Sequence, residues 1–98
     1  MTRLAYRNQL IPMGRGLITP GASAALEEAG VSAWEYLCRH SSGDWGVLDA
    51  EDKVANDDAV LFGGRILSAY ELPMTDVKIW IITEADRSAT TILLPSEY

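Results

Sequence analysis

His40 is the only histidine of the chain, and it stands four residues before Asp44. A carboxylate that orients an imidazole is a recurring device of acid–base catalysis. A histidine at the end of a helix is also favourable as a cation that faces the free carbonyl groups, and we favour this structural interpretation. A single histidine excludes a multi-histidine metal site within one chain, so we expect no metal and no cofactor.

Cys38 is the only cysteine, and its spacing of four residues from Trp34 predicts a small buried side chain rather than a nucleophile. One cysteine cannot form an internal disulfide, and the N-terminus lacks the apolar run of a signal peptide, so we expect a cytoplasmic protein. The sequence contains no phosphate-binding glycine loop, nucleophile elbow or zinc-protease motif. We therefore expect a protein that is not an enzyme.

Two predicted loops carry residues that are common in functional sites. Trp45 stands between a carboxylate and a glycine, where a large aromatic side chain either fills the core or forms a binding anchor. We favour the core position and keep Trp45 among the binding candidates. The segment 84–88 concentrates charge at a strand end, and we interpret it as a solvated turn with a local Asp86–Arg87 pair.

The net charge of −6 is distributed unevenly along the chain. Residues 1–43 carry four arginines and three glutamates, whereas residues 44–98 carry eleven acids and four bases. An acidic surface repels phosphate groups, so direct nucleic-acid binding is disfavoured and a protein partner with a basic surface is expected. The alternative is that the charge only keeps a small protein soluble.

The acidic residues are densest between residues 44 and 58, where six acids accompany Lys53 alone. In a helix that begins at Asp49, Glu51 and Asp58 are seven residues apart and face the same way, which predicts an exposed acidic stripe. The candidate partner-binding residues are Asp44, Trp45, Asp49, Glu51, Asp52, Asp57 and Asp58.

Three helices are predicted in the first two thirds of the chain, each from an N-cap residue. The caps are Thr19, Ser32 and Asp49, and the helices that follow them run over 20–29, 33–40 and 50–62. The predicted apolar positions are Ala22, Ala25, Leu26 and Ala29 in the first helix, Trp34, Leu37 and Cys38 in the second, and Val54, Ala55, Leu61 and Phe62 in the third.

From Arg65 onward the apolar period shortens to two residues, which is the signature of strands. Strands are predicted over 65–72, 77–83 and 90–94, and their short connections favour an antiparallel meander. We therefore expect one α+β domain over residues 1–98, with two to three helices packed on a three-stranded antiparallel sheet. Residues 1–18 are expected to form an extended or irregular arm.

Several segments together resemble a family of small uncharacterised bacterial proteins that occur on plasmids, prophages and genomic islands. The segments that carry the resemblance are 19–22, 37–40, 42–46, 65–70 and 79–98. Some family members are labelled as restriction-system subunits, but 98 residues are too few for a methyltransferase domain. The family supplies no catalytic residues to carry over. This chain departs from the family at residues 73–76: the resemblance implies a hairpin turn that contains glycine, whereas the sequence here is Pro-Met-Thr-Asp.

The leading functional hypothesis combines the acidic composition with this resemblance. It is an inhibitor that binds a host defence complex, of the anti-CRISPR or anti-restriction kind, by occupying a basic nucleic-acid channel. One alternative is a small RNA-processing or toxin-like enzyme that uses His40 with Asp44 or Glu84. Another is a housekeeping or replication accessory protein with a single dedicated partner.

Overall fold

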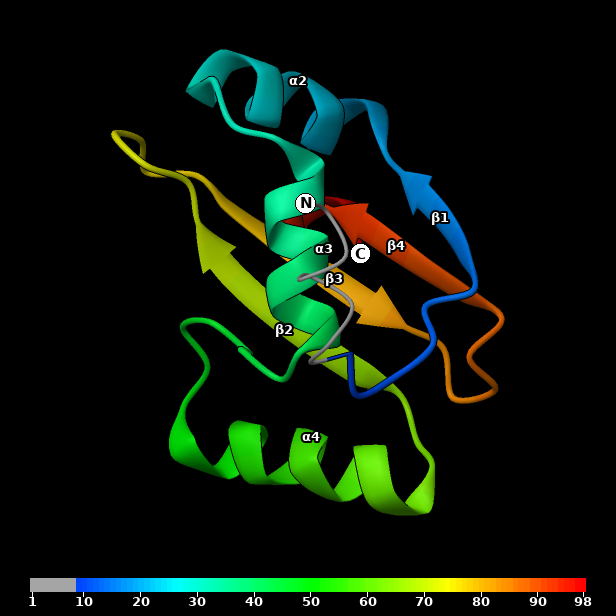
Figure 1. Ribbon diagram of the computed structural model, residues 1–98. Helices are drawn as coiled ribbons and strands as arrows, with labels where there is room; N and C mark the ends of the chain where they lie inside the picture. Colours follow the sequence, from blue (N-terminus) through cyan, green and yellow to red (C-terminus); the bar gives the residue numbers. More distant parts are fainter. Residues whose placement is uncertain (1–8) are drawn as a thin grey trace.

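A computed structural model describes residues 9–98, in which three helices accompany a four-stranded mixed sheet (Figure 1). The strands are β1 (Arg15–Ile18), β2 (Ile66–Glu71), β3 (Lys78–Thr83) and β4 (Ala89–Leu93), in the spatial order β1-β4-β3-β2. The three C-terminal strands form the antiparallel meander that their short connections predict, whereas β1 runs parallel to β4. The α+β class is confirmed. The expectation of a three-stranded antiparallel sheet is wrong, because β1 adds a fourth, parallel strand.

The segment that was expected to be an extended or irregular arm contains β1, and Gly14 explains how the strand reaches the sheet. Gly14 has a φ of 61°, and a Cβ atom there would lie 2.4 Å from the carbonyl oxygen of Arg87. A glycine therefore lets the chain pass close to the turn before β4, and the N–H of Arg15 then donates to the carbonyl of Ser88 at 3.0 Å. Residues 1–8, the start of the predicted arm, lie outside the described residues.

The helices follow their capping signals closely. They are α2 (Pro20–Ala29), α3 (Ala33–Ser41) and α4 (Ala50–Phe62), and a 3₁₀ turn, η1 (Pro95–Glu97), follows β4. The side chains of Thr19, Ser32 and Asp49 each accept a hydrogen bond from a backbone N–H in the first turn of the helix that they begin. In the connector between β2 and β3, Met74 has a φ of 63°, a left-handed conformation that normally favours glycine.

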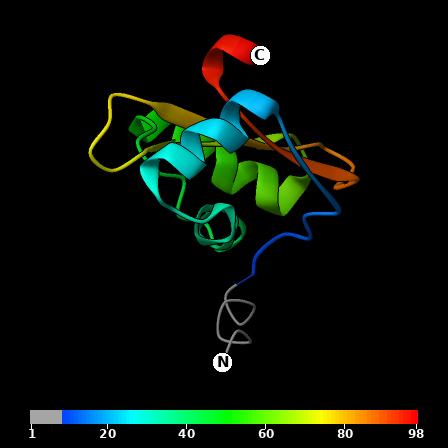
Figure 2. The ribbon, with the colours of Figure 1, turned by 90° about the horizontal axis from the view of Figure 1, so that it is seen from above.

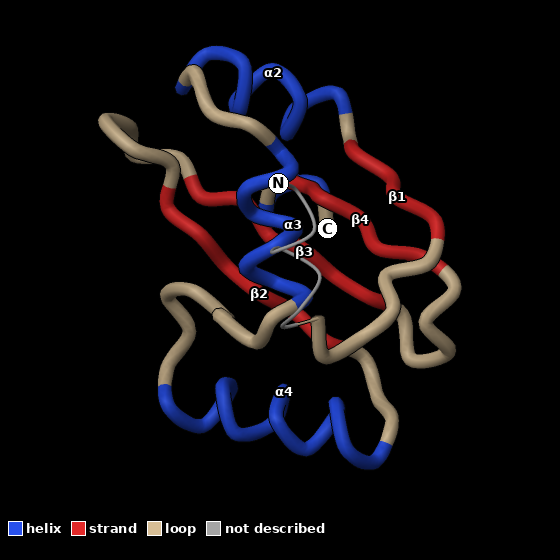
Figure 3. Tube along the Cα trace, in the orientation of Figure 1, coloured by secondary structure: helices blue, strands red, loops and turns tan. Residues whose placement is uncertain are grey.

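Helix α3 crosses the middle of one face of the sheet, α2 packs at one end of this face, and α4 lies beside β2 (Figure 1, Figure 3). The C-terminal residues lie on the opposite side of the sheet from α3 (Figure 2). There the ring of Tyr98 packs edge-on against Trp80, and the guanidinium of Arg65 lies 5.0 Å from the centre of the Tyr98 ring. No helix within residues 9–98 has both the length and the apolar composition needed to span a membrane.

Two apolar clusters hold the elements together. The larger one joins α2 and α3 to the sheet, and its buried members include Leu26, Tyr36 and Ile81. The smaller one lies under α4, where Ile11, Trp45, Ala59 and Ile66 meet. The predicted inward face of α2 is confirmed: Ala22 and Leu26 are buried, and Ala25 and Ala29 pack against the same cluster.

The predicted inward stripe of α3 is wrong for two of its three members. Trp34 is exposed and Cys38 is only partly buried, although burial raises the pKa of its thiol. The buried residues are instead Tyr36 and His40, one helical turn apart, and Ser41 at the end of the helix. Tyr36 packs against the ring of Tyr70 with 5.3 Å between the ring centres, which fixes this face of α3 against the sheet.

Candidate functional site

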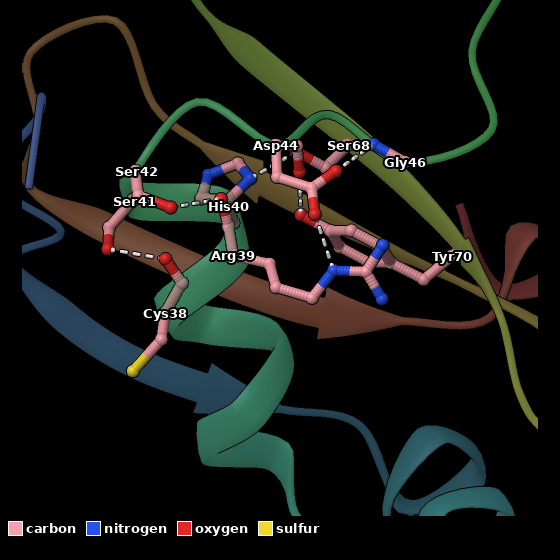
Figure 4. A network of polar contacts seen from close by, with 9 residues as sticks. All are labelled: Cys38, Arg39, His40, Ser41, Ser42, Asp44, Gly46, Ser68 and Tyr70. Atoms are coloured by element: carbon pink, nitrogen blue, oxygen red, sulfur yellow. Dashed lines mark hydrogen bonds and ion pairs between the residues drawn. The ribbon is translucent and has the colours of Figure 1, made fainter. Parts of the chain in front are cut away.

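His40 sits at the centre of a buried polar network that links α3 to the sheet (Figure 4). Its Nδ1 atom lies 2.6 Å from the hydroxyl of Ser68, and its Nε2 atom lies 2.8 Å from the hydroxyl of Thr83. Thr83 in turn lies 2.7 Å from Thr90, whose hydroxyl donates to the carbonyl of Met13 at 2.7 Å. The network thus joins five segments of the chain: α3, the strands β2, β3 and β4, and the segment before β1.

The donor and acceptor roles in this network follow from its last bond. Because Thr90 gives its proton to a carbonyl oxygen, it accepts a hydrogen bond from Thr83. Thr83 therefore accepts from Nε2–H of His40, and the Nδ1 atom of the neutral ring accepts from Ser68. Burial lowers the pKa of His40 to about 4, so the ring is neutral at pH 7.

Both sequence interpretations of His40 are corrected by this geometry. The ring pairs with hydroxyl groups rather than with Asp44, and it is not a cation at the helix end. A serine hydroxyl beside an imidazole resembles the start of a nucleophilic site, but both side chains are wholly buried.

Asp44 instead holds the loop that follows α3 (Figure 4). Its carboxylate accepts a hydrogen bond from Arg39 at 2.7 Å and another from the N–H of Gly46, and the bond from Arg39 is the main reason that its pKa is lowered. The hydroxyl of Tyr70 donates to the Asp44 carbonyl at 2.6 Å. Asp44 therefore has a structural role, because its bonds hold the loop between α3 and α4 in place.

Trp45 takes the core position that we favoured, with 4% of its surface exposed. Its indole packs edge-on against His40, and its Nε1–H donates to the carboxylate of Asp57 at 3.0 Å. This side chain is a core residue, and Asp57 is its polar partner. Asp49 is likewise structural, because its carboxylate accepts the N–H of Asp52 and caps α4.

Helix α4 is held against β2 by polar contacts at its middle and its end. The side chain of Asn56 bonds both backbone groups of Leu67, donating at 2.8 Å and accepting at 3.2 Å. The guanidinium of Arg87 donates to the carbonyls of Ala59 and Gly64 near the C-terminus of the helix. The expected Asp86–Arg87 pair is therefore wrong, since Arg87 turns toward α4 and Asp86 accepts the N–H of Ser88.

Because of these contacts, the side of α4 that faces the sheet is not the side that the sequence predicts. Asn56 and Ala59 face the sheet, whereas all four apolar residues that were expected inside, Val54, Ala55, Leu61 and Phe62, are exposed. Val54 exposes 57% of its surface, Leu61 74% and Phe62 82%. The spacing of apolar residues could not predict that Asn56 and Ala59 face the sheet, because Asn56, at the middle of this face, is polar.

Val54, Leu61 and Phe62 share their helical face with the two acids predicted to lie together. We call this face the α4 stripe; its members are Glu51, Val54, Asp58, Leu61 and Phe62. Their spacings of three, four and seven residues place them on one side of the helix. Asp52 is also exposed, but it lies on the same side of the helix as Asn56 and lines the pocket beside Leu67. Of the seven predicted binding residues, Trp45 is buried and the six acids are exposed; Asp44, Asp49 and Asp57 each also accept a hydrogen bond from within the fold.

The α4 stripe combines carboxylates with exposed aliphatic and aromatic side chains, a composition that is common in docking surfaces. Within residues 9–98 no group of three or more histidine, cysteine or acidic side chains is arranged to hold a metal ion. Comparisons with protein-family models, with curated proteins and with solved structures find no match to this chain.

Proposed function

We propose that the protein is a non-catalytic binding protein that docks the α4 stripe on a basic protein surface. The observation that carries the proposal is the exposure of Val54, Leu61 and Phe62 in line with Glu51 and Asp58. Exposed large apolar side chains on one helical face are typical of a helix that occupies a groove in a partner. The acids add selectivity for a groove with a basic rim.

The partner class that fits best is a nucleic-acid-binding complex of a host defence system. Such complexes have basic channels, and an acidic helix presents negative charge to them as a phosphate backbone does. An inhibitor of the anti-CRISPR or anti-restriction kind, carried by a mobile element, is the function that this chemistry supports. The apolar residues provide contacts that a nucleic acid does not have, so an inhibitor of this kind competes through surface burial as well as charge.

The test reverses charge on the α4 stripe and measures binding to purified defence complexes, one CRISPR effector and one restriction enzyme. We expect Glu51→Lys with Asp58→Lys to weaken binding at least tenfold, about 1.4 kcal/mol, at physiological salt. The matched control is Glu27→Lys with Glu28→Lys, which makes the same change in net charge at two exposed residues of α2. Equal losses in both variants would show that only the overall charge matters.

A second pair of variants separates the apolar contribution from charge. Leu61→Ser with Phe62→Ser keeps the net charge, and both side chains are largely exposed, so the fold should remain intact. We expect at least a tenfold loss of binding, because these side chains are the anchors of the stripe. Binding to neither complex by the unmodified chain, or unchanged binding in both stripe variants, would contradict the proposed function.

A further inference from the structure

The backbone groups at the two edges of the sheet differ in whether they have hydrogen-bond partners. At the β2 edge, Asn56 bonds both backbone groups of Leu67, while Ala69 donates to the carbonyl of Trp45 and accepts from the N–H of Val47. At the other edge, no strand of residues 9–98 lies beyond β1, and all four β1 residues are exposed. Unpaired strand edges are templates for another strand, and β1, although only four residues long and carrying Arg15, contains no proline and no bulge that would block pairing.

The backbone groups on the open side of β1 belong to Gly16 and Ile18. Arg15 and Thr19 donate their N–H groups to β4, at 3.0 Å in both cases. Because backbone direction alternates along a strand, the N–H and C=O groups of Gly16 and Ile18 point away from β4. An added antiparallel strand would bond to these two residues.

We propose that β1 pairs with β1 of a second copy of this chain, antiparallel and centred on Leu17, to form an eight-stranded sheet across a two-fold axis. In this register Gly16 of each copy exchanges both backbone hydrogen bonds with Ile18 of the other. The two Leu17 side chains then meet at the centre, and Arg15 lies opposite Thr19 of the second copy.

The side chains of β1 complement themselves in this register on one face of the sheet. Gly16 and Ile18 share the face of Thr90 and Ile92, where an apolar groove of about 250 Å³ runs between β1 and α3. A Cβ atom on Gly16 would meet no atom within 4 Å, so the space above it is open. Ile18 of the second copy lies across from this glycine and leans into the groove. The interface thus contains two symmetric pairs, in each of which Ile18 of one copy lies opposite Gly16 of the other.

Charge complementarity on the other face favours a second copy over an unrelated strand. The hydroxyl of Thr19 donates to the carboxylate of Glu97 at 2.5 Å, which places a negative charge beside Thr19. Arg15 of the second copy lies opposite Thr19 and therefore beside this carboxylate, and the two-fold axis repeats the pair. Each copy supplies one cation and one anion to the interface, although the chain carries a net charge of −6.

The test is the oligomeric state of the full chain, measured by sedimentation equilibrium. We expect a monomer–dimer equilibrium that Gly16→Val weakens at least tenfold, because the valine fills the space that Ile18 of the second copy needs. The substitution suits the monomer, since Gly16 is not in the left-handed region and has open space around it. The control is Glu71→Val, which adds the same side chain at an exposed position of β2.

Hydrogen exchange locates the contact. We expect the amides of Gly16 and Ile18 to become protected as protein concentration rises, and Glu51→Lys with Asp58→Lys to leave the dimer intact. A chain that stays monomeric up to about 1 mM overturns the proposal. A dimer that Gly16→Val does not weaken, with freely exchanging Gly16 and Ile18 amides, overturns it too. Circular dichroism of each variant confirms that a lost dimer is not a lost fold.

Discussion

At the scale of single residues, the most informative group is the imidazole of His40. Every donor and acceptor of the ring has a partner, and no buried side-chain nitrogen or oxygen atom of residues 9–98 lacks one. A satisfied buried network favours one packing of α3 against the sheet over alternatives that leave a polar atom unpaired. The same network makes the fold sensitive to protonation, because Nδ1 must stay an acceptor for Ser68.

We predict that stability falls as the pH decreases from about 7 toward 4.5. His40 titrates near 6.5 when unfolded and near 4 when folded, so within this window the unfolded chain binds more protons. Protonation therefore favours unfolding, and the expected loss is about 2 to 3 kcal/mol. Urea unfolding at several pH values measures it.

The control for this prediction is His40→Gln, which keeps a donor and an acceptor but does not titrate. This variant is expected to be less stable at pH 7 and to show a flat profile between pH 7 and 4.5. The carboxylates of Asp44 and Glu97, whose pKa values are lowered, lose their stabilising contribution only at lower pH. A slope that persists in His40→Gln would assign the pH dependence to other groups.

The sequence indicates the position of His40 at the end of a helix but not its chemistry. The partners Ser68 and Thr83 lie 28 and 43 residues further along the chain, and only the sheet register brings them together. Trp45 differs, because a large aromatic beside a glycine already favoured a core position, which the structure confirms. Local sequence signals thus predicted the packing role of Trp45. They could not predict the role of His40, because its hydroxyl partners are distant in sequence.

At the scale of elements, helix α4 depends on Asn56 for its attachment to β2. The asparagine side chain acts as one more strand residue, because it donates to and accepts from Leu67 at the sheet edge. It thereby closes the β2 edge and turns the α4 stripe outward. Gly46 assists at the same edge: its φ is 80°, and a Cβ there would lie 1.8 Å from the carbonyl oxygen of Ala69.

We predict that Asn56→Ala destabilises the protein by about 1 to 3 kcal/mol, because it leaves two part-buried backbone groups of Leu67 without partners. Faster hydrogen exchange at the Leu67 amide should accompany the loss. Lys53→Ala, at an exposed position one turn earlier on α4, is the control and should change stability by no more than about 0.5 kcal/mol. A loss of stability with a protected Leu67 amide would show that another group replaces the side chain.

The elements themselves were largely predictable, and the exceptions have physical causes. Side-chain capping by Thr19, Ser32 and Asp49 is local, so the helix bounds followed from sequence. Strand β1 escaped detection because its four residues are all exposed and show no alternation of buried and exposed positions. The orientation of α4 escaped because tertiary hydrogen bonds of Asn56 outweigh the apolar pattern.

At the scale of the whole molecule, the two proposed surfaces lie at opposite edges of one sheet. The α4 stripe is beside β2, and the open edge is β1 (Figure 3). The proposed dimer would therefore carry its two α4 stripes at the far ends of an eight-stranded sheet. Such an arrangement presents two separate binding faces, so a partner with repeated basic sites would be bound by both copies at once.

The net charge gives these two associations opposite responses to salt. Two copies that each carry −6, with centres about 30 Å apart, repel by about 2 kcal/mol at 0.01 M salt and about 0.1 kcal/mol at 0.15 M. We therefore predict that the dimer tightens at least tenfold between these concentrations. The two Arg15–Glu97 pairs of the dimer are screened as well, but each exposed pair contributes less than about 1 kcal/mol, and charges in close contact are screened only in part over this range of salt.

Binding of the α4 stripe to a basic partner should change in the other direction, because salt screens an attraction rather than a repulsion. Sedimentation equilibrium of the chain alone and binding kinetics with a defence complex, both measured from 0.01 to 0.5 M salt, separate the two effects. A dimer that weakens with salt would mean that ion pairs hold it, contrary to pairing through β1 backbone groups. Partner binding that is insensitive to salt would show that the acids of the stripe only keep the protein soluble, and that the apolar residues Val54, Leu61 and Phe62 provide the binding.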